Sequence, residues 1–350
     1  MKIALISPLP PPSGGIARWT ERYLAWFKGK AEVLIVNTAL VGKRAASAGA
    51  RMRVFDELLR VCRIIRETRT KLKDKPDLVH LNTSCSKTGI IRDWVCARMA
   101  AKRRVPVVVQ CHCNIEDQLG DSSIAVWMFR KITAIAAVVL VLNEKSRSYA
   151  EQYAPGRVIV CPNFIMTDQI VDSHSIRDEI RTIIYAGDVR RSKGSDDLFR
   201  LAEQFPEKKF VLAGAVAEEM KTLKKPENVT LLGRLEAEDV YRQMDQADVF
   251  LFPSLTEGFS NALLEAMAHG LPVIATDVGA NADMIEDQGG IIATVHDVKA
   301  MRDAVDYLES RNVRTRMSLW NIAKTSEHYT QDAVLGKLVE IYSAVLSQNG

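Results

Sequence analysis

FPSLTEGFSNALLEAMAHGLPVIAT, residues 252–276, places two carboxylates on either side of a turn between a strand and a helix. The apolar run Val249–Phe252 at its start is typical of a strand, and Asn261–His269 is typical of a helix. Glu257 therefore falls in the loop and Glu265 inside the helix. We expect the loop to aim backbone N–H groups at a crevice, because the first turn of a helix leaves its donors unpartnered. Sugar hydroxyls and phosphates bind such donors.

A lone glutamate decorates a helix surface more often than it binds a ligand, but the pattern around this pair is more specific. Glycine and proline punctuate a unit of strand, loop, helix, strand and loop, at Gly258, Gly270, Pro272 and Gly279. The unit resembles the retaining nucleotide-sugar glycosyltransferases of family 4, the group 1 transferases of the GT-B fold. Their signature is Glu, seven residues, Glu, then Ala-Met-Ala-x-Gly-x-Pro-Val, and Glu257 and Glu265 have that spacing.

Length and composition indicate a globular protein of more than one domain. The 350 residues are 47% hydrophobic and 26% charged, which excludes fibrous and disordered classes. The longest apolar stretch, Ile132–Leu142, is too short to cross a bilayer, and the N-terminus opens directly into the strand-like Lys2–Ile6. We therefore expect a cytoplasmic protein without a signal peptide.

The net charge of +4 is distributed unevenly between the two halves of the chain. Residues 1–165 carry 27 Lys and Arg against 13 Asp and Glu, a net charge of +14, which leaves −10 for the remainder. Between Lys43 and Lys75, arginines alternate with apolar residues at roughly helical spacing. Such a helix can rest on an anionic membrane, and it can equally pack its apolar face on its own sheet. We expect a peripheral protein at the inner face of the plasma membrane, and no nucleic acid partner, because no aromatic or glycine-rich binding module accompanies the charge.

The six cysteines lie scattered through the first half and suggest no disulfide framework. The sequence Cys111-His112-Cys113 invites a metal interpretation, but alternate residues of a strand point to opposite faces and no second cluster supplies ligands. We expect reduced, partly buried cysteines and no metal site.

Strand-like runs alternate with helical stretches along the whole chain. Apolar strands separated by helices predict parallel sheets covered on both faces, and twelve strands fit two domains better than one. The predicted strands are Lys2–Ser7, Val33–Asn37, Leu78–Asn82, Val105–Gln110, Ala137–Leu142, Val158–Cys161, Ile183–Ala186, Lys209–Ala213, Thr230–Leu232, Val249–Phe252, Val273–Ala275 and Gly290–Ala293.

The predicted fold class is α/β, and the resemblance implies a GT-B fold of two doubly wound, Rossmann-like domains facing a central cleft. We place the acceptor-side domain at residues 1–164 and the donor-binding domain at residues 165–329. Apolar residues recur at helical spacing from about Asp332 to Ser347. The resemblance implies that this last helix, at about 330–350, packs back on the first domain.

Two loops are candidates for binding the donor, one at its diphosphate and the other at its nucleotide base. Gly14 and Gly15 separate the first strand from a helix, where paired glycines allow close backbone approach. The spacing alone fits a tight turn equally well, and the resemblance carries both glycines over as donor-binding residues. Gly233-Arg234-Leu235 follows another strand, and the resemblance implies that Arg234 and Leu235 contact the nucleotide through their backbone.

The loop Gly187–Gly194 follows the first strand of the second domain. A cation at the carboxyl end of a strand, next to a helix, can neutralise a leaving diphosphate. The family has Gly-Arg here and Lys-Gly five residues after the arginine, and this chain keeps Lys193 but has Asp188 in place of the arginine. We expect Arg190 to supply the missing charge, with Arg191 as the alternative.

The remaining site residues are carried over from the resemblance. His112, at the end of a strand, matches the cleft histidine near the donor sugar and is a predicted catalytic residue with Glu257, Lys193 and Arg190. The donor set also includes Glu265 and the loop residues Gly258, Phe259 and Ser260. Weaker acceptor-side predictions are His80, Asn82, Thr83, Ser84 and Arg92.

The resemblance, together with these residues, implies a retaining, metal-independent transferase without a cofactor. It would move a sugar from a nucleotide donor, UDP favoured over GDP, to a hydroxyl of a saccharide or lipid-linked acceptor in bacterial polysaccharide or glycolipid biosynthesis. Two alternatives stay open: a phosphorylase or epimerase on the same fold, and a catalytically weakened adaptor. The Asp188 substitution favours the adaptor, and the retained Glu257, Glu265 and Lys193 argue against it.

Overall fold

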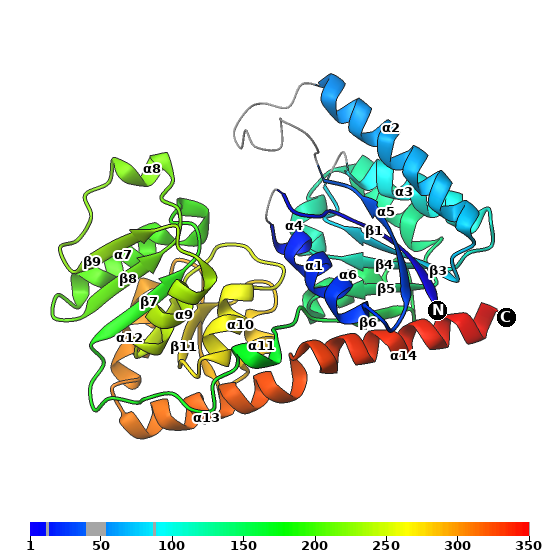
Figure 1. Cartoon of the computed structure of the whole chain (residues 1–350). Coiled ribbons are helices and arrows are strands. Elements are labelled where there is room, and N and C mark those ends of the chain that lie inside the picture. The colour runs from blue at the N-terminus through cyan, green and yellow to red at the C-terminus, as the bar shows by residue number, and fades with distance from the viewer. Residues whose placement is uncertain (12–13, 40–53, 87–88, 350) are drawn as a thin grey trace. The chain divides into compact units, whose positions relative to one another are not determined.

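The computed structural model describes residues 1–11, 14–39, 54–86 and 89–349 and divides into two compact units. Unit 1 comprises Met1–Asn163 with Val334–Gly350, and unit 2 comprises Phe164–Ala333 (Figure 1). Each unit holds one six-stranded sheet whose strands pair in parallel, with helices between successive strands. The predicted α/β class and the two doubly wound, parallel-sheet domains are therefore confirmed. All twelve predicted strands are present, and no strand boundary differs from the prediction by more than two residues.

The sheet of unit 1 has the order β2-β1-β3-β4-β5-β6. The chain leaves β1 toward one edge and then returns to build the other, so the direction of winding reverses between β1 and β3. Ligands of doubly wound sheets bind beyond the carboxyl ends of the strands at such a reversal, the switch point. The strands are β1 (Lys2–Ser7), β2 (Glu32–Asn37), β3 (Leu78–Thr83), β4 (Val107–Cys111), β5 (Val138–Val141) and β6 (Val158–Val160).

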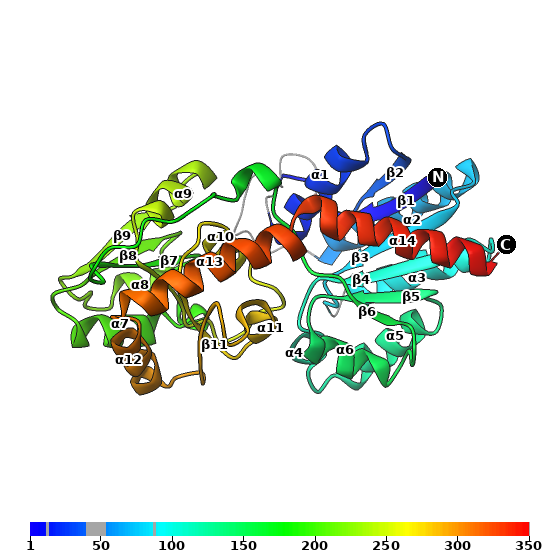
Figure 2. The same ribbon diagram turned by 90° about the horizontal axis from the view of Figure 1, so that it is seen from below.

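Helices cover both faces of this sheet. Because side chains alternate along a strand, Val79 and Leu81 of β3 face the core beneath α2, α3 and α5, whereas His80 faces α1 and α14. Figure 2 shows α14 crossing this sheet, and its Tyr342 contacts both His80 and α1. The helices are α1 (Gly15–Phe27), α2 (Val54–Lys71), α3 (Gly89–Ala101), α4 (Ile115–Leu119), α5 (Ser123–Thr133), α6 (Glu144–Glu151) and α14 (Gln331–Asn349).

The sheet of unit 2 has the order β12-β11-β10-β7-β8-β9, so its switch point lies between β7 and β10. Its strands are β7 (Thr182–Ala186), β8 (Lys209–Ala213), β9 (Val229–Gly233), β10 (Val249–Phe252), β11 (Val273–Thr276) and β12 (Gly290–Ala293). Its helices are α7 (Ser195–Gln204), α8 (Glu218–Lys221), α9 (Ala237–Asp245), α10 (Asn261–Ala268), α11 (Asn281–Ile285), α12 (Val298–Tyr307) and α13 (Arg311–His328).

The predicted basic helix is α2, and residues 43–53 of that prediction lie outside the described residues. α2 packs on its own sheet through the fully buried Ile64. Arg63 donates to the carbonyls of Asn37 and Ala39, which fixes the helix to the end of β2. The apolar face thus packs inside unit 1, which is one of the two alternatives drawn from the sequence.

Candidate functional site

The switch point of unit 2 brings together two predicted site residues. Lys193 follows β7 and Glu257 follows β10, and these two strands are neighbours in the sheet. Lys193 Nζ lies 2.5 Å from Glu257 Oε1, and the side chains are 30% and 12% exposed. The two loops are also joined through their backbones, since Leu255 N donates to Ser192 O at 3.2 Å. A cation and a carboxylate therefore share the position where this fold binds ligands.

A buried serine that the sequence analysis missed holds Glu257 in place. Ser254 Oγ donates to Glu257 Oε1 at 2.8 Å, and Ser254 is completely buried. The carbonyl of Ser254 in turn accepts a hydrogen bond from Thr276 Oγ1 at 2.5 Å. The only signal in the sequence is a serine three residues before the glutamate. The carboxylate is therefore fixed by neighbouring strands before any ligand arrives.

Close backbone approach makes glycine necessary at two positions of this site. A Cβ on Gly194, whose φ is +72°, would lie 1.9 Å from Pro253 O. A Cβ on Gly279, whose φ is +55°, would lie 2.4 Å from Glu257 O. A side chain at Gly194 would push the Lys193 loop away from Pro253, and a side chain at Gly279 would push the segment after β11 away from the Glu257 loop.

Helix α10 begins directly after the Glu257 loop and turns its N-terminus toward it. Ser260 is the N-cap, accepting from Leu263 N at 3.1 Å, and the first turn contains no acidic residue. The positive end of the helix dipole therefore remains available to an anion. Glu265 lies half-buried one turn into the helix, and the ring of Phe259 packs on Tyr329 at 6.0 Å.

The arginine pair of the Gly187–Gly194 loop is engaged by acids. Arg190 Nη2 lies 3.4 Å from Asp188 Oδ2. Arg190, which we expect to supply the charge missing at position 188, therefore contacts the aspartate at that position. Arg191 Nε lies 3.6 Å from Asp196 Oδ2, and its side chain is 58% exposed. Beneath them Tyr185 donates to Asp188 O at 2.9 Å, and burial, helped by the charge of Glu257, raises the pKa of this phenol. The other predicted donor residues of unit 2, Arg234 and Leu235, follow β9, where Arg234 is exposed.

Unit 1 contains a buried hydrogen-bonded network centred on Asn82. Its Oδ1 lies 2.9 Å from His80 Nε2 and 3.0 Å from His112 Nε2. His80 Nδ1 bonds the hydroxyl of Tyr342 in α14, and this hydroxyl lies 3.1 Å from Tyr23 Oη in α1. Residues from a central strand, a strand end and two helices therefore form one cluster.

The acceptor at the centre fixes the direction of these bonds. A carbonyl oxygen cannot donate, so both histidines present Nε2–H to Asn82, and His80 Nδ1 accepts from Tyr342. Burial lowers the pKa of His80 to about 4, and burial together with the charge of His80 lowers the pKa of His112 to about 3. Both rings are thus neutral at pH 7, and His112 keeps Nδ1 as a hydrogen-bond acceptor.

The geometry alters the interpretation of several predicted residues in unit 1. His80 is completely buried and both ring nitrogens are bonded, so it orders the network and leaves no nitrogen for an acceptor molecule. Thr83 is also buried and accepts from Cys85 N at 3.0 Å. Gly14 is the N-cap of α1, and a Cβ there would meet open space, so no clash requires this glycine.

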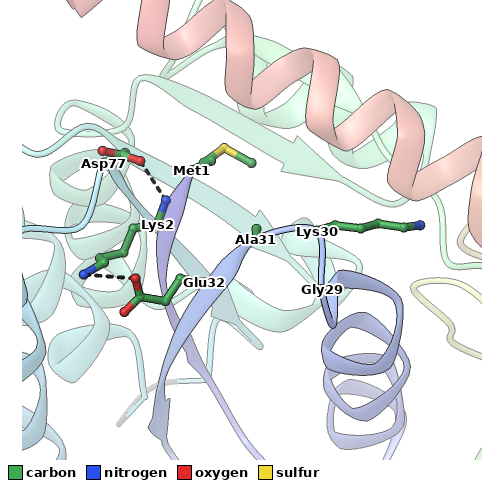
Figure 3. Close-up of a pocket in the computed structure, with 7 residues that line it drawn as sticks. All are labelled: Met1, Lys2, Gly29, Lys30, Ala31, Glu32 and Asp77. Atoms are coloured by element: carbon green, nitrogen blue, oxygen red, sulfur yellow. Dashed lines mark hydrogen bonds and ion pairs between the residues drawn. The ribbon is translucent and has the colours of Figure 1, made fainter.

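Two hollows of unit 1 lie at opposite edges of its sheet. One, of about 510 Å³, surrounds the amino ends of β1 and β2, where Lys2 pairs with Glu32 at 3.0 Å and its backbone N–H donates to Asp77 (Figure 3). The amino edge is not where parallel sheets bind ligands, so we assign this hollow no function. The other, of about 230 Å³, lies at the carboxyl edge and includes Asn82 and Ser84.

Three further observations concern the described part of the chain. No three His, Cys, Asp or Glu side chains in it form a cluster that could hold a metal ion. All six cysteines are free thiols, and Cys85 and Cys111 are buried at the ends of neighbouring strands. No helix within the described ranges has both the length and the apolar character needed to span a bilayer.

Comparison with known proteins identifies the family. Residues 180–310 match the model of group 1 glycosyl transferases, and residues 46–169 match the model of glycosyltransferase family 4. The chain belongs to the group 1, family 4 glycosyltransferases. The signature around Glu257 and Glu265 lies within the first of these matches.

Three curated proteins show the range of relatives of this chain. The chain is 24% identical to the teichuronic acid biosynthesis glycosyltransferase TuaC of Bacillus subtilis, over 68% of this chain and 62% of the relative. It is 33% identical to the lipopolysaccharide core mannosyltransferase LpsB of Rhizobium meliloti, over 31% of each. It is 31% identical to one polypeptide of the human phosphatidylinositol N-acetylglucosaminyltransferase, over 55% of this chain and 42% of the relative. The match spans less than two thirds of the length of each relative.

Solved structures share the fold at low sequence identity. A sucrose-phosphate synthase from Thermosynechococcus elongatus matches with a TM-score of 0.78 and 16% identity, over 99% of this chain and 100% of that chain. Anabaena HepE in complex with UDP matches with a TM-score of 0.76 and 16% identity, over 98% and 100%. The lipopolysaccharide outer core galactosyltransferase WaaB matches with a TM-score of 0.75 and 18% identity, over 98% and 100%.

Proposed function

We propose that the protein is a retaining glycosyltransferase that moves a sugar from a nucleoside diphosphate to an acceptor hydroxyl. The observation that carries the proposal is the contact between Lys193 and Glu257 at the switch point of unit 2. In such a transfer the sugar carbon becomes positively charged while negative charge builds on the departing phosphate. The Glu257 carboxylate and the Lys193 ammonium group are 2.5 Å apart. The carboxylate suits the positively charged sugar carbon, and the ammonium group suits the negatively charged phosphate at the other end of the bond that breaks.

Each donor-side residue has a role in this proposal. Lys193, Arg190 and the first-turn amides of α10 stabilise the leaving diphosphate without requiring a divalent metal. Glu257 binds hydroxyls of the donor sugar and steadies its developing positive charge, while Glu265 accepts hydrogen bonds from the ribose. His112, held neutral by Asn82, offers Nδ1 to a hydroxyl of the sugar. The departing phosphate itself assists attack of the acceptor from the same face.

A uridine nucleotide is the preferred donor in this proposal, because HepE, which shares the fold, is a complex with UDP. Relatives named for teichuronic acid, lipopolysaccharide core and phosphatidylinositol chemistry support a saccharide or lipid-linked acceptor. The proposed setting is bacterial polysaccharide or glycolipid assembly.

The decisive experiment is a panel of nucleotide sugars with release of UDP, GDP or ADP monitored, first without acceptor and then with saccharide and lipid-linked acceptors. Lys193→Ala should reduce transfer by about 10²–10³-fold, because it removes a charge that stabilises the leaving group. Lys299→Ala, an exposed lysine of α12, is the matched control and should keep wild-type rates. Full transfer by the Lys193 variant would refute the phosphate role. Conversion of the donor into a different nucleotide sugar, without acceptor and without release of nucleotide, would favour an epimerase.

We also propose that unit 1 rests on an anionic membrane through α2. Leu58 and Leu59 of this helix are 59% and 53% exposed, and Arg66 and Arg69, further along the same helix, are also exposed. Apolar side chains next to arginines suit the boundary between acyl chains and anionic headgroups. Replacing the two leucines by serine and the two arginines by glutamine should abolish sedimentation with liposomes containing anionic lipid. Leu319→Ser, at an exposed leucine of α13 in unit 2, should sediment like wild type, and unchanged sedimentation of the α2 variant would end the proposal.

A further inference from the structure

The pocket of about 230 Å³ in unit 1 lies at the switch point of the sheet. Pro8 follows β1, and Asn82, Ser84 and Ser86 belong to β3 and the segment after it, so the wall comes from the two strands between which the winding reverses. Unit 1 is a doubly wound sheet like unit 2, and the same rule therefore predicts a ligand here. No residue of this pocket belongs to the Lys193 and Glu257 loops.

Two arginines line this pocket from the helices α2 and α3. Arg92 is buried at 7% exposure, and its Nη2 lies 2.6 Å from Asp93 Oδ1, which also accepts from Nε at 2.8 Å. Arg60 is 19% exposed, and its Nη2 lies 3.2 Å from Glu57 Oε1. Each guanidinium is therefore anchored by a single carboxylate oxygen. A guanidinium has five N–H donors, so each anchored arginine has further donors beyond these contacts.

One of these donors has no partner although it is buried. Arg60 Nε has no hydrogen-bond partner within the described structure. Burial lowers the pKa of Arg60, and the charge of Arg92 opposes protonation further, although Glu57 favours it. Two guanidinium groups that repel each other across a pocket, one with an orphaned N–H, are stabilised by an anion between them. The hydroxyls of Ser84 and Ser86 add uncharged donors to the same wall.

We propose that this pocket binds a phosphate group carried by the acceptor, next to the hydroxyl that receives the sugar. The inference rests on the proposed function, because it assigns the substrate class of the acceptor side. A phosphate offers several charged oxygens, which match guanidinium forks and hydroxyl donors. The phosphate can belong to a saccharide linked to lipid through a diphosphate or to a water-soluble saccharide phosphate.

Binding can be tested without turnover, on the full chain, by calorimetric titration with pyrophosphate and with inorganic phosphate. Arg60→Gln should weaken pyrophosphate binding at least 10-fold, whereas Arg103→Gln should bind like wild type. Arg103 is exposed on the turn before β4, at the opposite edge of the sheet. Lys193→Ala reports on the other phosphate site and should leave the Arg60-dependent binding in place. Wild-type binding by Arg60→Gln, or loss of all binding in Lys193→Ala alone, would overturn the proposal.

A second variant tests the pocket in case Arg60→Gln does not fold. Ser84→Ala removes one donor without disturbing a charge pair and should weaken pyrophosphate binding about 3-fold. If Arg60→Gln does not fold, wild-type binding by Ser84→Ala counts against the pocket.

The transfer assay separates this inference from the proposed function. With a phosphate-bearing acceptor, Arg60→Gln should raise the KM for the acceptor at least 10-fold and leave the KM for the nucleotide sugar unchanged. With a neutral saccharide acceptor the variant should match wild type. Transfer that is equally efficient to neutral and phosphorylated acceptors would refute the pocket while leaving the transferase intact. Pyrophosphate binding that depends on Arg60 in a protein that transfers no sugar would support the pocket and refute the transferase. Lipid-linked and soluble phosphates, run in parallel, identify the source of the phosphate.

Discussion

The buried His80 should make unit 1 sensitive to acid in a way that one substitution can reveal. His80 is completely buried, donates from Nε2 to Asn82 and accepts at Nδ1 from Tyr342. A proton on Nδ1 would remove the only acceptor that this ring offers to Tyr342, and it would place a charge where no water can solvate it. We therefore choose His80→Gln as the perturbation, because a glutamine amide can both donate and accept.

The size of the effect follows from the pKa. Burial lowers the pKa of His80 from 6.5 to about 4, a shift worth about 3 kcal/mol at about 1.4 kcal/mol per pH unit. Because the folded pKa is the lower one, the unfolded chain binds the proton first as the pH falls. The part of the stability of unit 1 that depends on a neutral His80, about 3 kcal/mol, is therefore fully present above pH 6.5 and is lost as the pH falls from 6.5 to about 4. Below pH 4 the contribution of His80 levels off.

The assay measures the free energy of unfolding in urea at several pH values between 7 and 4. Four of the five tryptophans, at positions 19, 26, 94 and 127, lie in unit 1, so a Trp320→Phe background makes fluorescence report on that unit. In this background His80→Gln should reduce the slope of stability against pH by about 1.4 kcal/mol per unit between pH 6 and 4.5. His112, with its pKa lowered to about 3, should continue to contribute a slope of the same sign.

His328→Gln controls for the loss of one imidazole, because this histidine is about half exposed at the end of α13. Absolute stability is not the readout, since the glutamine can lower it at every pH. If His80→Gln keeps the wild-type slope, His80 takes up its proton at the same pH in the folded and the unfolded chain, and the assignment of its Nδ1 as the acceptor of the Tyr342 hydroxyl is wrong.

Three further predictions concern single residues. Glu265→Ala should raise the KM for the nucleotide sugar about 10-fold with little change in kcat, because ribose contacts are equally strong in the ground and transition states; a fall in kcat alone would contradict this. Gly194→Ala should lower the free energy of unfolding of unit 2, measured in urea, by at least about 3 kcal/mol, because the left-handed φ and the clash with Pro253 O both oppose a side chain. Wild-type stability would show that the Lys193 loop can move away from Pro253. Tyr342→Phe should lower the free energy of unfolding of unit 1 by about 1–3 kcal/mol, because His80 Nδ1 loses its hydrogen-bond donor. Tyr307→Phe, at an exposed tyrosine, is the control, and equal stability of the two variants would argue against the network.

The pattern of the sequence predicted the fold because the signals were local. Buried parallel strands are apolar throughout, and each run between turn residues became a strand. The spacing of Glu257 and Glu265 and the Lys193-Gly194 pair were likewise readable, since each is a short pattern in the segment that follows a strand. Asp188 could be recognised as a departure from the family, but only the structure shows Arg190 beside it.

The network around Asn82 could not be predicted from the sequence. Tyr342 lies 262 residues from His80, and no local pattern distinguishes a helix tyrosine that donates to a strand histidine from one that fills a core. The acceptor role predicted for His80 rested on its place in a strand, which gives the face of the sheet but not what covers that face. Only the packing of α14 on unit 1 shows that both ring nitrogens of His80 are hydrogen-bonded.

Topology, more than proximity in sequence, places the chemistry in both units. Lys193 and Glu257 are 64 residues apart and meet because β7 and β10 are neighbours at the switch point. In unit 1 the wall that carries Arg60, Arg92 and Asn82 surrounds the equivalent reversal between β1 and β3. A position at such a reversal is reached by several loops, so a change in one loop can be compensated by another. Within the Gly187–Gly194 loop, Arg190 contacts Asp188, and we propose that it supplies the charge of the arginine that the family has at position 188.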